Sequence, residues 1–203
     1  MADSAKLKEL LGRMAKQSAS GGGIWMRDGV YDKLIVKHIE YKETFEHGLS
    51  FIAELYVAAS RNDPQAKTGK PNKPEIYSPE GSQVEANPAG STLTFFQGDL
   101  DSKREDYFKM AFGNVKQFML TLAGEPDFPE TDEEAAKAFV NNCLIAAGPD
   151  QPLTGAAIKA TTRRKWTKTS GNLLVLPVWE TLPNTPDDVE ATKKLLAGIP
   201  AAA

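Results

Sequence analysis

The chain contains 203 residues, of which 41% are hydrophobic and 25% are charged, and its formal net charge is −3. This composition is typical of a soluble globular protein with one domain and appendages. The acidic balance excludes a general attraction to nucleic acid, so any such binding must come from local segregation of charge. No apolar run approaches the ~20 residues that span a bilayer, so we expect no membrane partner. One cysteine and two histidines exclude an internal disulfide and a Cys-based zinc site, so we expect no metal and no cofactor.

The N-terminus predicts a short amphipathic helix and a flexible linker, which together occupy residues 1–23. Four apolar residues recur there at helical spacing between charged residues: Leu7, Leu10, Leu11 and Met14. The Ser/Gly-rich stretch 18–23 then ends the helix. The segment lacks the uninterrupted apolar centre of a secretory signal, which indicates a cytoplasmic protein. The helix could pack on the body of the chain, on a second subunit or on a partner, and we prefer the body because such stripes usually serve packing.

Two long strands, near residues 30–41 and 49–57, are predicted to form a hairpin at the start of the body. Val, Ile, Leu and Tyr are frequent in the first, and apolar and polar residues alternate in the second. In the first strand, the residues with odd numbers mix aromatic, aliphatic and cationic side chains: Tyr31, Lys33, Ile35, Lys37, Ile39 and Tyr41. If the even face enters the core, the odd face exposes tyrosines beside lysines, as a stacking platform for bases requires. A strand that is covered on both faces is the alternative.

A long loop and a third strand region follow this hairpin. Residues 61–79 combine prolines, lysines and a glycine without any periodicity, which predicts an exposed loop. Such a basic loop either follows a phosphate backbone or has no role. Short strands are then predicted near residues 82–86 and 91–96, separated by an Asn-Pro-Ala-Gly turn.

Helical patterns occupy the remaining segments outside the last hairpin. One helix is predicted to be capped by Asp101 and ended by Gly124, with an aromatic stripe that belongs to the core. A capping box at 131–134 predicts a second helix, in which Cys143 is a buried apolar residue rather than a nucleophile. A last helix is predicted to start near Thr185.

Residues 153–179 predict a second hairpin, whose connector is cationic and aromatic. No Asp or Glu occurs in this window, although the protein is acidic. Five residues of the connector, within six positions, carry a charge or an indole ring: Arg163, Arg164, Lys165, Trp166 and Lys168. Because cations meet phosphates and an indole stacks on bases, this pattern is typical of a site for a polyanion that carries flat rings. The alternative is a solvated hairpin in which Trp166 packs on the core.

Motifs of the common enzyme classes are missing from the sequence. It contains no glycine-rich phosphate loop, no Gly-x-Ser-x-Gly and no His-Glu-x-x-His. Two acidic pairs, Asp99 with Asp101 and Glu133 with Glu134, could hold magnesium for a nuclease. Both pairs stand at predicted helix starts, where negative charge has a structural use. We therefore expect a protein without enzymatic activity.

The order of the predicted elements favours a mainly β protein with helical insertions, in the form of an OB-fold-like five-stranded barrel. A hairpin of two long strands precedes a third strand, a helical insertion at about 101–148 and a final hairpin, as in an OB-fold. This domain is predicted to span residues 24–182, and a C-terminal helix and tail occupy 183–203. The final hairpin takes the place of strands four and five, whose connecting loop grips oligonucleotides in OB-folds.

Three parts of the sequence resemble phage-encoded single-stranded-DNA-binding proteins of OB-fold type: GVYDKLIVKHIEYKE with GLSFIAELYV, FFQGDLDSKREDYFKMAFGNVKQFMLTLAG, and LTGAAIKATTRRKWTKTSGNLLVLPVW. The resemblance covers about residues 24–182 and rests on the layout of these parts. It implies that the protein acts in a phage replication or recombination module, in the cytoplasm of an infected or lysogenic bacterium. Replication or recombination proteins would be its partners, and the protein could form a homo-oligomer. Two departures are the ending GIPAAA, which lacks the acidic tip of many bacterial single-strand binders, and an insertion longer than a minimal OB-fold needs.

We therefore predict that the protein binds single-stranded DNA, with RNA as the alternative nucleic acid. The hairpin cations would neutralise phosphates and Trp166 would stack on a base, with an extension across the first long strand. The predicted nucleic-acid-binding residues are Lys159, Arg163, Arg164, Lys165, Trp166, Lys168, Tyr31, Lys33, Lys37 and Tyr41. The competing hypothesis is a protein-interaction or assembly module whose basic hairpin binds an acidic protein partner.

Overall fold

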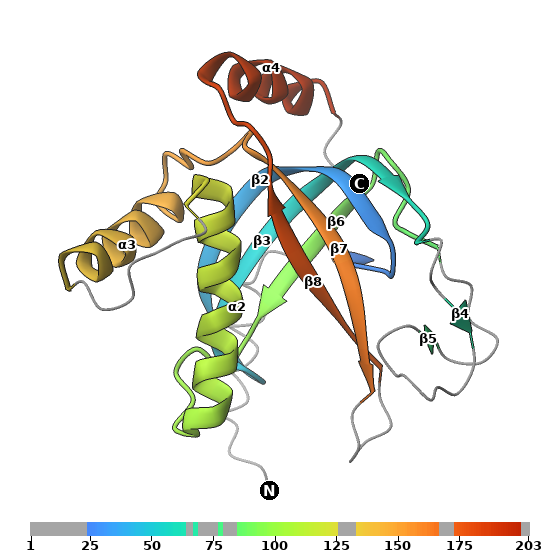
Figure 1. Ribbon diagram of the computed structural model, residues 1–203. Coiled ribbons are helices and arrows are strands. Elements are labelled where there is room, and N and C mark those ends of the chain that lie inside the picture. Colours follow the sequence, from blue (N-terminus) through green and yellow to red (C-terminus); the bar gives the residue numbers. More distant parts are fainter. Residues whose placement is uncertain are drawn as a thin grey trace, which may run out of the picture.

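The computed structural model describes residues 24–63, 67–68, 77–78, 85–125, 133–166 and 173–199 (Figure 1). The predicted N-terminal helix, most of the loop 61–79, the capping residues 131–132 and the connector 167–172 fall outside these residues.

The protein is mainly β, with one large sheet and three helices in the described part of the chain (Figure 1). The strands of this sheet are β1 (Ile24–Trp25), β2 (Val30–Thr44), β3 (Gly48–Arg61), β6 (Thr92–Gln97), β7 (Ala157–Trp166) and β8 (Leu173–Thr181). Their order is β1-β6-β3-β2-β7-β8, in which the five longer strands are antiparallel and β1 runs parallel to β6. Two short strands, β4 (Lys67–Thr68) and β5 (Tyr77–Ser78), form a separate parallel pair within the predicted loop.

The last long strands at the two ends of the sheet, β6 (beside the short β1) and β8, approach each other without pairing. In the residues that the structure describes, no backbone ladder joins them, so hydrogen bonds do not close the sheet. Aromatic side chains bridge the gap instead. The ring centroid of Trp179 on β8 lies 5.0 Å from that of Phe95 on β6 and 4.9 Å from that of Phe118 on helix α2 (Glu105–Ala123). The predicted mainly β class is confirmed, and the sheet is open where a barrel would close.

Strand β2 changes its inward face twice along its length. Its core residues alternate between odd and even numbers in three blocks: Tyr31, then Leu34 and Val36, then Ile39 with Tyr41 packed beside it. The register of β2 against its neighbours shifts between Tyr31 and Leu34 and again between Val36 and His38. Each such bulge moves the following side chains to the opposite face. The predicted odd face, with tyrosines and lysines exposed together, is therefore wrong.

The three described helices lie in the segments that the sequence predicts, although the predicted core stripe of α2 is buried only in part. Helices α2 and α3 (Glu133–Ala146) stand between β6 and β7, and α4 (Pro186–Ala197) follows β8. Gly124 ends α2 in the left-handed conformation, with φ 73°, and Cys143 is buried on α3, both as predicted. The Thr185 side chain accepts a hydrogen bond from the backbone N–H of Asp188 and so caps α4. Among the described residues, no helix combines the length and hydropathy of a membrane span.

The predicted cap of α2 at Asp101 is wrong. The helix begins four residues later, at Glu105, and its N-cap residue Arg104 forms no side-chain cap. Asp101 Oδ1 instead accepts a hydrogen bond from the backbone N–H of Leu49, over 3.0 Å. This carboxylate therefore stabilises the start of β3. An Asp side chain before a helix can accept a hydrogen bond from any nearby backbone N–H, and here the nearby donor belongs to another element.

Candidate nucleic-acid interface

The β7–β8 hairpin runs past the strand beside it. Up to Thr161, β7 pairs with β2 on one side and with β8 on the other. Residues 163–166 pair only with β8 in the described part of the chain, and Figure 1 shows this end of the hairpin extending beyond the rest of the sheet. The side chains of Arg163, Arg164, Lys165 and Trp166, and the whole of Lys168, lie outside the described residues, so their roles stay predictions.

A buried polar network holds the hairpin where it leaves the sheet. The Thr162 hydroxyl donates to Asp28 Oδ1 and accepts from the Gly29 N–H, both over 2.8 Å, and the Thr162 N–H donates to the Gly29 carbonyl over 3.1 Å. Asp28 and Thr162 are both buried. A Cβ at Gly29 would lie 2.4 Å from the Cβ of Ala86, so this close approach requires glycine. Because satisfied buried networks rigidify their surroundings, the base of the projecting hairpin is held in place.

Three predicted site lysines, Lys33, Lys37 and Lys159, continue from the hairpin across the outward side of the sheet. Lys33 sits in the first bulge of β2, and Lys159 lies opposite this bulge on β7. Lys37 sits at the second bulge, and its Nζ donates to Thr92 Oγ1 of β6 over 3.3 Å. All three lysines are half-buried, and in the described residues no ion pair joins them to a carboxylate. The bulges therefore place the lysines of β2, half-buried, on the face opposite the tyrosines, where Ile35 between them is fully buried.

The two predicted stacking residues of β2, Tyr31 and Tyr41, belong to the core. Tyr31 is fully buried, and its hydroxyl lies 2.8 Å from the Arg27 carbonyl oxygen and 2.5 Å from Asn87 Oδ1. Tyr41 packs edge-on against Phe51, at 5.3 Å between ring centroids. Burial raises the pKa of both hydroxyls above their ordinary value. Tyr31 therefore presents no ring face to a base, and Tyr41 is partly buried against the core.

Exposed aromatic rings that the sequence analysis does not select gather on the outward side of β6. Trp25 on β1 is 64% exposed and meets the ring of Phe96 edge-on at 5.9 Å, and His47 approaches the same ring at 5.4 Å. Phe45, in the turn before β3, is 87% exposed. One sequence signal exists: of two adjacent phenylalanines in a strand, such as Phe95 and Phe96, one must face outward. No local signal places Trp25 here, because its strand pairs with a distant one.

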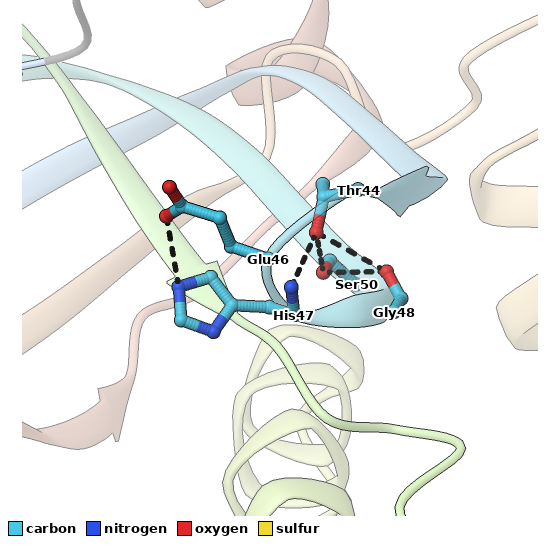
Figure 2. A network of polar contacts seen from close by, with 5 residues as sticks. All are labelled: Thr44, Glu46, His47, Gly48 and Ser50. Atoms are coloured by element: carbon cyan, nitrogen blue, oxygen red, sulfur yellow. Dashed lines mark hydrogen bonds and ion pairs between the residues drawn. The ribbon is translucent and has the colours of Figure 1, made fainter. Parts of the chain in front are cut away.

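The turn between β2 and β3 is enclosed by polar contacts in an acidic setting. Figure 2 shows Thr44 Oγ1 accepting from the His47 N–H over 3.3 Å and donating to the Gly48 carbonyl over 3.2 Å. The Glu46 carboxylate lies 4.0 Å from the His47 imidazole. The Asp99 N–H donates to the His47 carbonyl over 2.8 Å, which ties the turn to the segment that follows β6. Carboxylates around this turn repel phosphates, which distinguishes it from the hairpin.

The acidic pairs that could hold magnesium for a nuclease include residues with structural roles. Asp101 accepts from the Leu49 N–H, and Asp99 lies in a turn with φ 61°. Glu133 and Glu134 occupy the first turn of α3, where they complement the helix dipole. Among the described residues, His, Cys, Asp and Glu side chains form no group of three or more that could hold a metal ion.

Comparisons of the chain with models of protein families, with curated proteins and with solved structures found no match.

Proposed function

We propose that this protein binds single-stranded DNA on the outward side of its sheet, without catalysing a reaction. One observation carries the proposal: the end of the hairpin that projects beyond the sheet, residues 163–166, lies in the longest acid-free window of an acidic chain. A projecting cationic hairpin can approach a flexible polyanion without a clash from neighbouring strands. Lys159 of β7 and Lys33 and Lys37 of β2 extend the positive surface from the end of the hairpin to the neighbouring strand.

The strand order supports an OB-fold-like arrangement within this proposal. The first long strand, β2, pairs with the second and the fourth, β3 and β7, and helices α2 and α3 follow the third, β6. An OB-fold has this connectivity, and its barrel is partly open, with the loop between strands four and five gripping oligonucleotides. The contact of Trp179 with Phe95 holds β6 and β8 together at the open seam.

In the proposed complex, phosphates lie along cations and bases stack on aromatic rings. Arg163, Arg164, Lys165 and Lys168 neutralise phosphates, and the release of counterions makes the affinity depend on salt. Trp166 stacks on a base, an interaction that tolerates any sequence because every base has a flat face. Neither step makes or breaks a covalent bond. The setting, a phage replication or recombination module in a bacterial cytoplasm, rests on the sequence resemblance alone.

Anisotropy titrations of a labelled oligo-dT test this proposal. The variant R163A/R164A/K165A removes three cations from the hairpin, and the matched control K137A/K193A/K194A removes three exposed lysines from α3 and α4. We expect the hairpin variant to bind roughly fiftyfold more weakly at ~0.15 M salt, and its slope of log affinity against log salt to fall by about 2, since each single-strand phosphate contact contributes about 0.7. Equal losses in the two variants, or no binding by the unmodified protein, would contradict the proposal.

A protein-interaction module is the second candidate, because large apolar side chains are exposed on two helices. They are Tyr107, Phe108, Met110 and Phe112 of α2 and Val140, Leu144 and Ile145 of α3. Exposed apolar patches of this kind mark surfaces for a second subunit or a protein partner. Gel shifts with single-stranded DNA, duplex DNA and RNA separate the candidates, since an interaction module retards none of them. Magnesium-dependent loss of the oligonucleotide in the same gels would instead reveal a nuclease.

A further inference from the structure

A cleft of about 480 Å³ opens where β6 and β8 fail to pair. Trp25 and Phe96 form one wall, Leu176 of β8 lies on the opposite wall, and Asn114 and Gln117 of α2 close the side. The volume is within the range of pockets that take small organic molecules. None of the described residues that line the cleft carries a formal charge.

The cleft combines flat aromatic surfaces with amide groups. Trp25 leaves most of its indole open to solvent while Phe96 supports it edge-on. The Asn114 amide donates to Gln97 Oε1 over 2.7 Å, which fixes its orientation, and Gln117 is exposed beside it. Aromatic rings stack on nucleobases, and Asn and Gln amides form paired hydrogen bonds with base edges. This set of side chains is therefore suited to a flat ring with polar edges.

The cleft lies directly beside the cationic strand of the hairpin. Two of its lining residues, Val175 and Leu176, stand on β8, and their partners across the ladder are Arg164 and Arg163. Neighbouring strands are ~4.8 Å apart, which is less than the reach of one nucleotide. A strand whose phosphates follow β7 can therefore turn a base into the cleft.

We propose that this cleft binds a nucleobase of the same single strand whose phosphates the β7–β8 hairpin neutralises. Trp25 stacks on the base, and Asn114 and Gln117 meet its polar edge. This inference rests on the proposed function and names a second part of the same site. The open seam between β6 and β8 thereby serves as the entrance for the base.

Trp25→Ala and Asn114→Leu in the full chain test the cleft, and Tyr107→Ala, which removes an exposed ring from α2, is the matched control. Each variant is titrated with oligo-dT and with an abasic oligonucleotide of equal length, which has phosphates but no bases. We expect Trp25→Ala to weaken oligo-dT binding at least about fivefold, because the contact with a stacked base is lost. The slope of log affinity against log salt should not change, because no phosphate contact is lost. Its affinity for the abasic strand should not change, and Tyr107→Ala should alter neither affinity.

The outcomes separate the cleft from the proposed function. Unchanged oligo-dT affinity in both cleft variants overturns the proposal that the cleft binds a base. The proposed function survives this result if R163A/R164A/K165A still weakens binding in the same assay. Equal losses on the two oligonucleotides also overturn the cleft proposal, since they reveal a phosphate contact or a damaged fold. If the unmodified protein binds neither oligonucleotide, the proposed function fails, and the cleft proposal fails with it.

Discussion

The β2–β3 and β7–β8 hairpins differ in what surrounds their ends. The turn of the first is enclosed by the Thr44 side chain and by Asp99 and Asp101 from the segment after β6. The end of the second leaves the sheet and, in the described residues, is held at its base by Thr162. Carboxylates gather at the first turn and are missing from the second. The two hairpins therefore differ in local charge, although the chain as a whole is acidic.

The largest effect is expected at the enclosed turn. Gly48 has a φ of 56°, and a Cβ there would lie 2.4 Å from Asp101 Oδ1. We expect Gly48→Ala to lower the free energy of unfolding by about 3 kcal/mol, because left-handed strain adds to the displacement of Asp101. Gly113→Ala is the control, since nothing lies within 4 Å of its added Cβ in α2, and it should stabilise the protein by up to about 1 kcal/mol. Urea unfolding measures both, and equal effects would show that the turn is not enclosed.

A second pair of variants compares the polar contacts that hold the two hairpins. Thr162→Val removes a buried hydroxyl from Asp28 and Gly29, and we expect it to lower the free energy of unfolding by about 2 kcal/mol. Thr44→Val removes a similar hydroxyl from a more solvated turn and should cost less than about 1 kcal/mol. Thermal unfolding of the two variants measures which loses more stability, and a larger loss of stability in Thr44→Val would contradict this prediction.

Substitution of one aromatic ring at each hairpin, the exposed Phe45 of the first and the predicted stacking residue Trp166 of the second, tests where nucleic acid binds. We expect Trp166→Ala to weaken the binding of oligo-dT about tenfold, the value of one stacked base. Phe45→Ala, at the acidic turn, should leave the affinity unchanged although its ring is more than four-fifths exposed. Fluorescence anisotropy at two salt concentrations measures both. A loss for Phe45→Ala alone would move the site to the other hairpin.

The smallest effect concerns the tyrosines that β2 buries near its two ends. Burial raises the pKa of Tyr31 and Tyr41 above their ordinary value of 10.0. As the pH rises, the unfolded chain loses these protons first, so this contribution to stability is complete well below pH 10, begins to fall as the pH approaches 10 and declines further above it. Between pH 8 and pH 10, each tyrosine should lower the free energy of unfolding by about 0.4 kcal/mol. Tyr41→Phe should remove its share, and an identical pH profile in this variant would show that Tyr41 ionises freely.

Elements with local causes were predictable. The two hairpins follow from strand-forming residues and alternation, Gly124 ends α2, and Thr185 caps α4, because each depends on neighbours within a few positions. The insertion of helices before the last hairpin is also confirmed. By contrast, the stacking role of Tyr31 and Tyr41 was assigned from a strict alternation that two bulges interrupt.

By itself, the sequence determined the mainly β class and the concentration of cations in one window, since both follow from residue type and order along the chain. Only the tertiary structure decided that the lysines of β2 face outward while its tyrosines face inward, and that Trp25 stands beside Phe96 at an open seam. Bulges and strand pairs depend on which distant segment each strand meets. The second partner of β2, which is β7, and the partner of β1, which is β6, lie far away in the sequence, so the local pattern could not reveal the candidate surface.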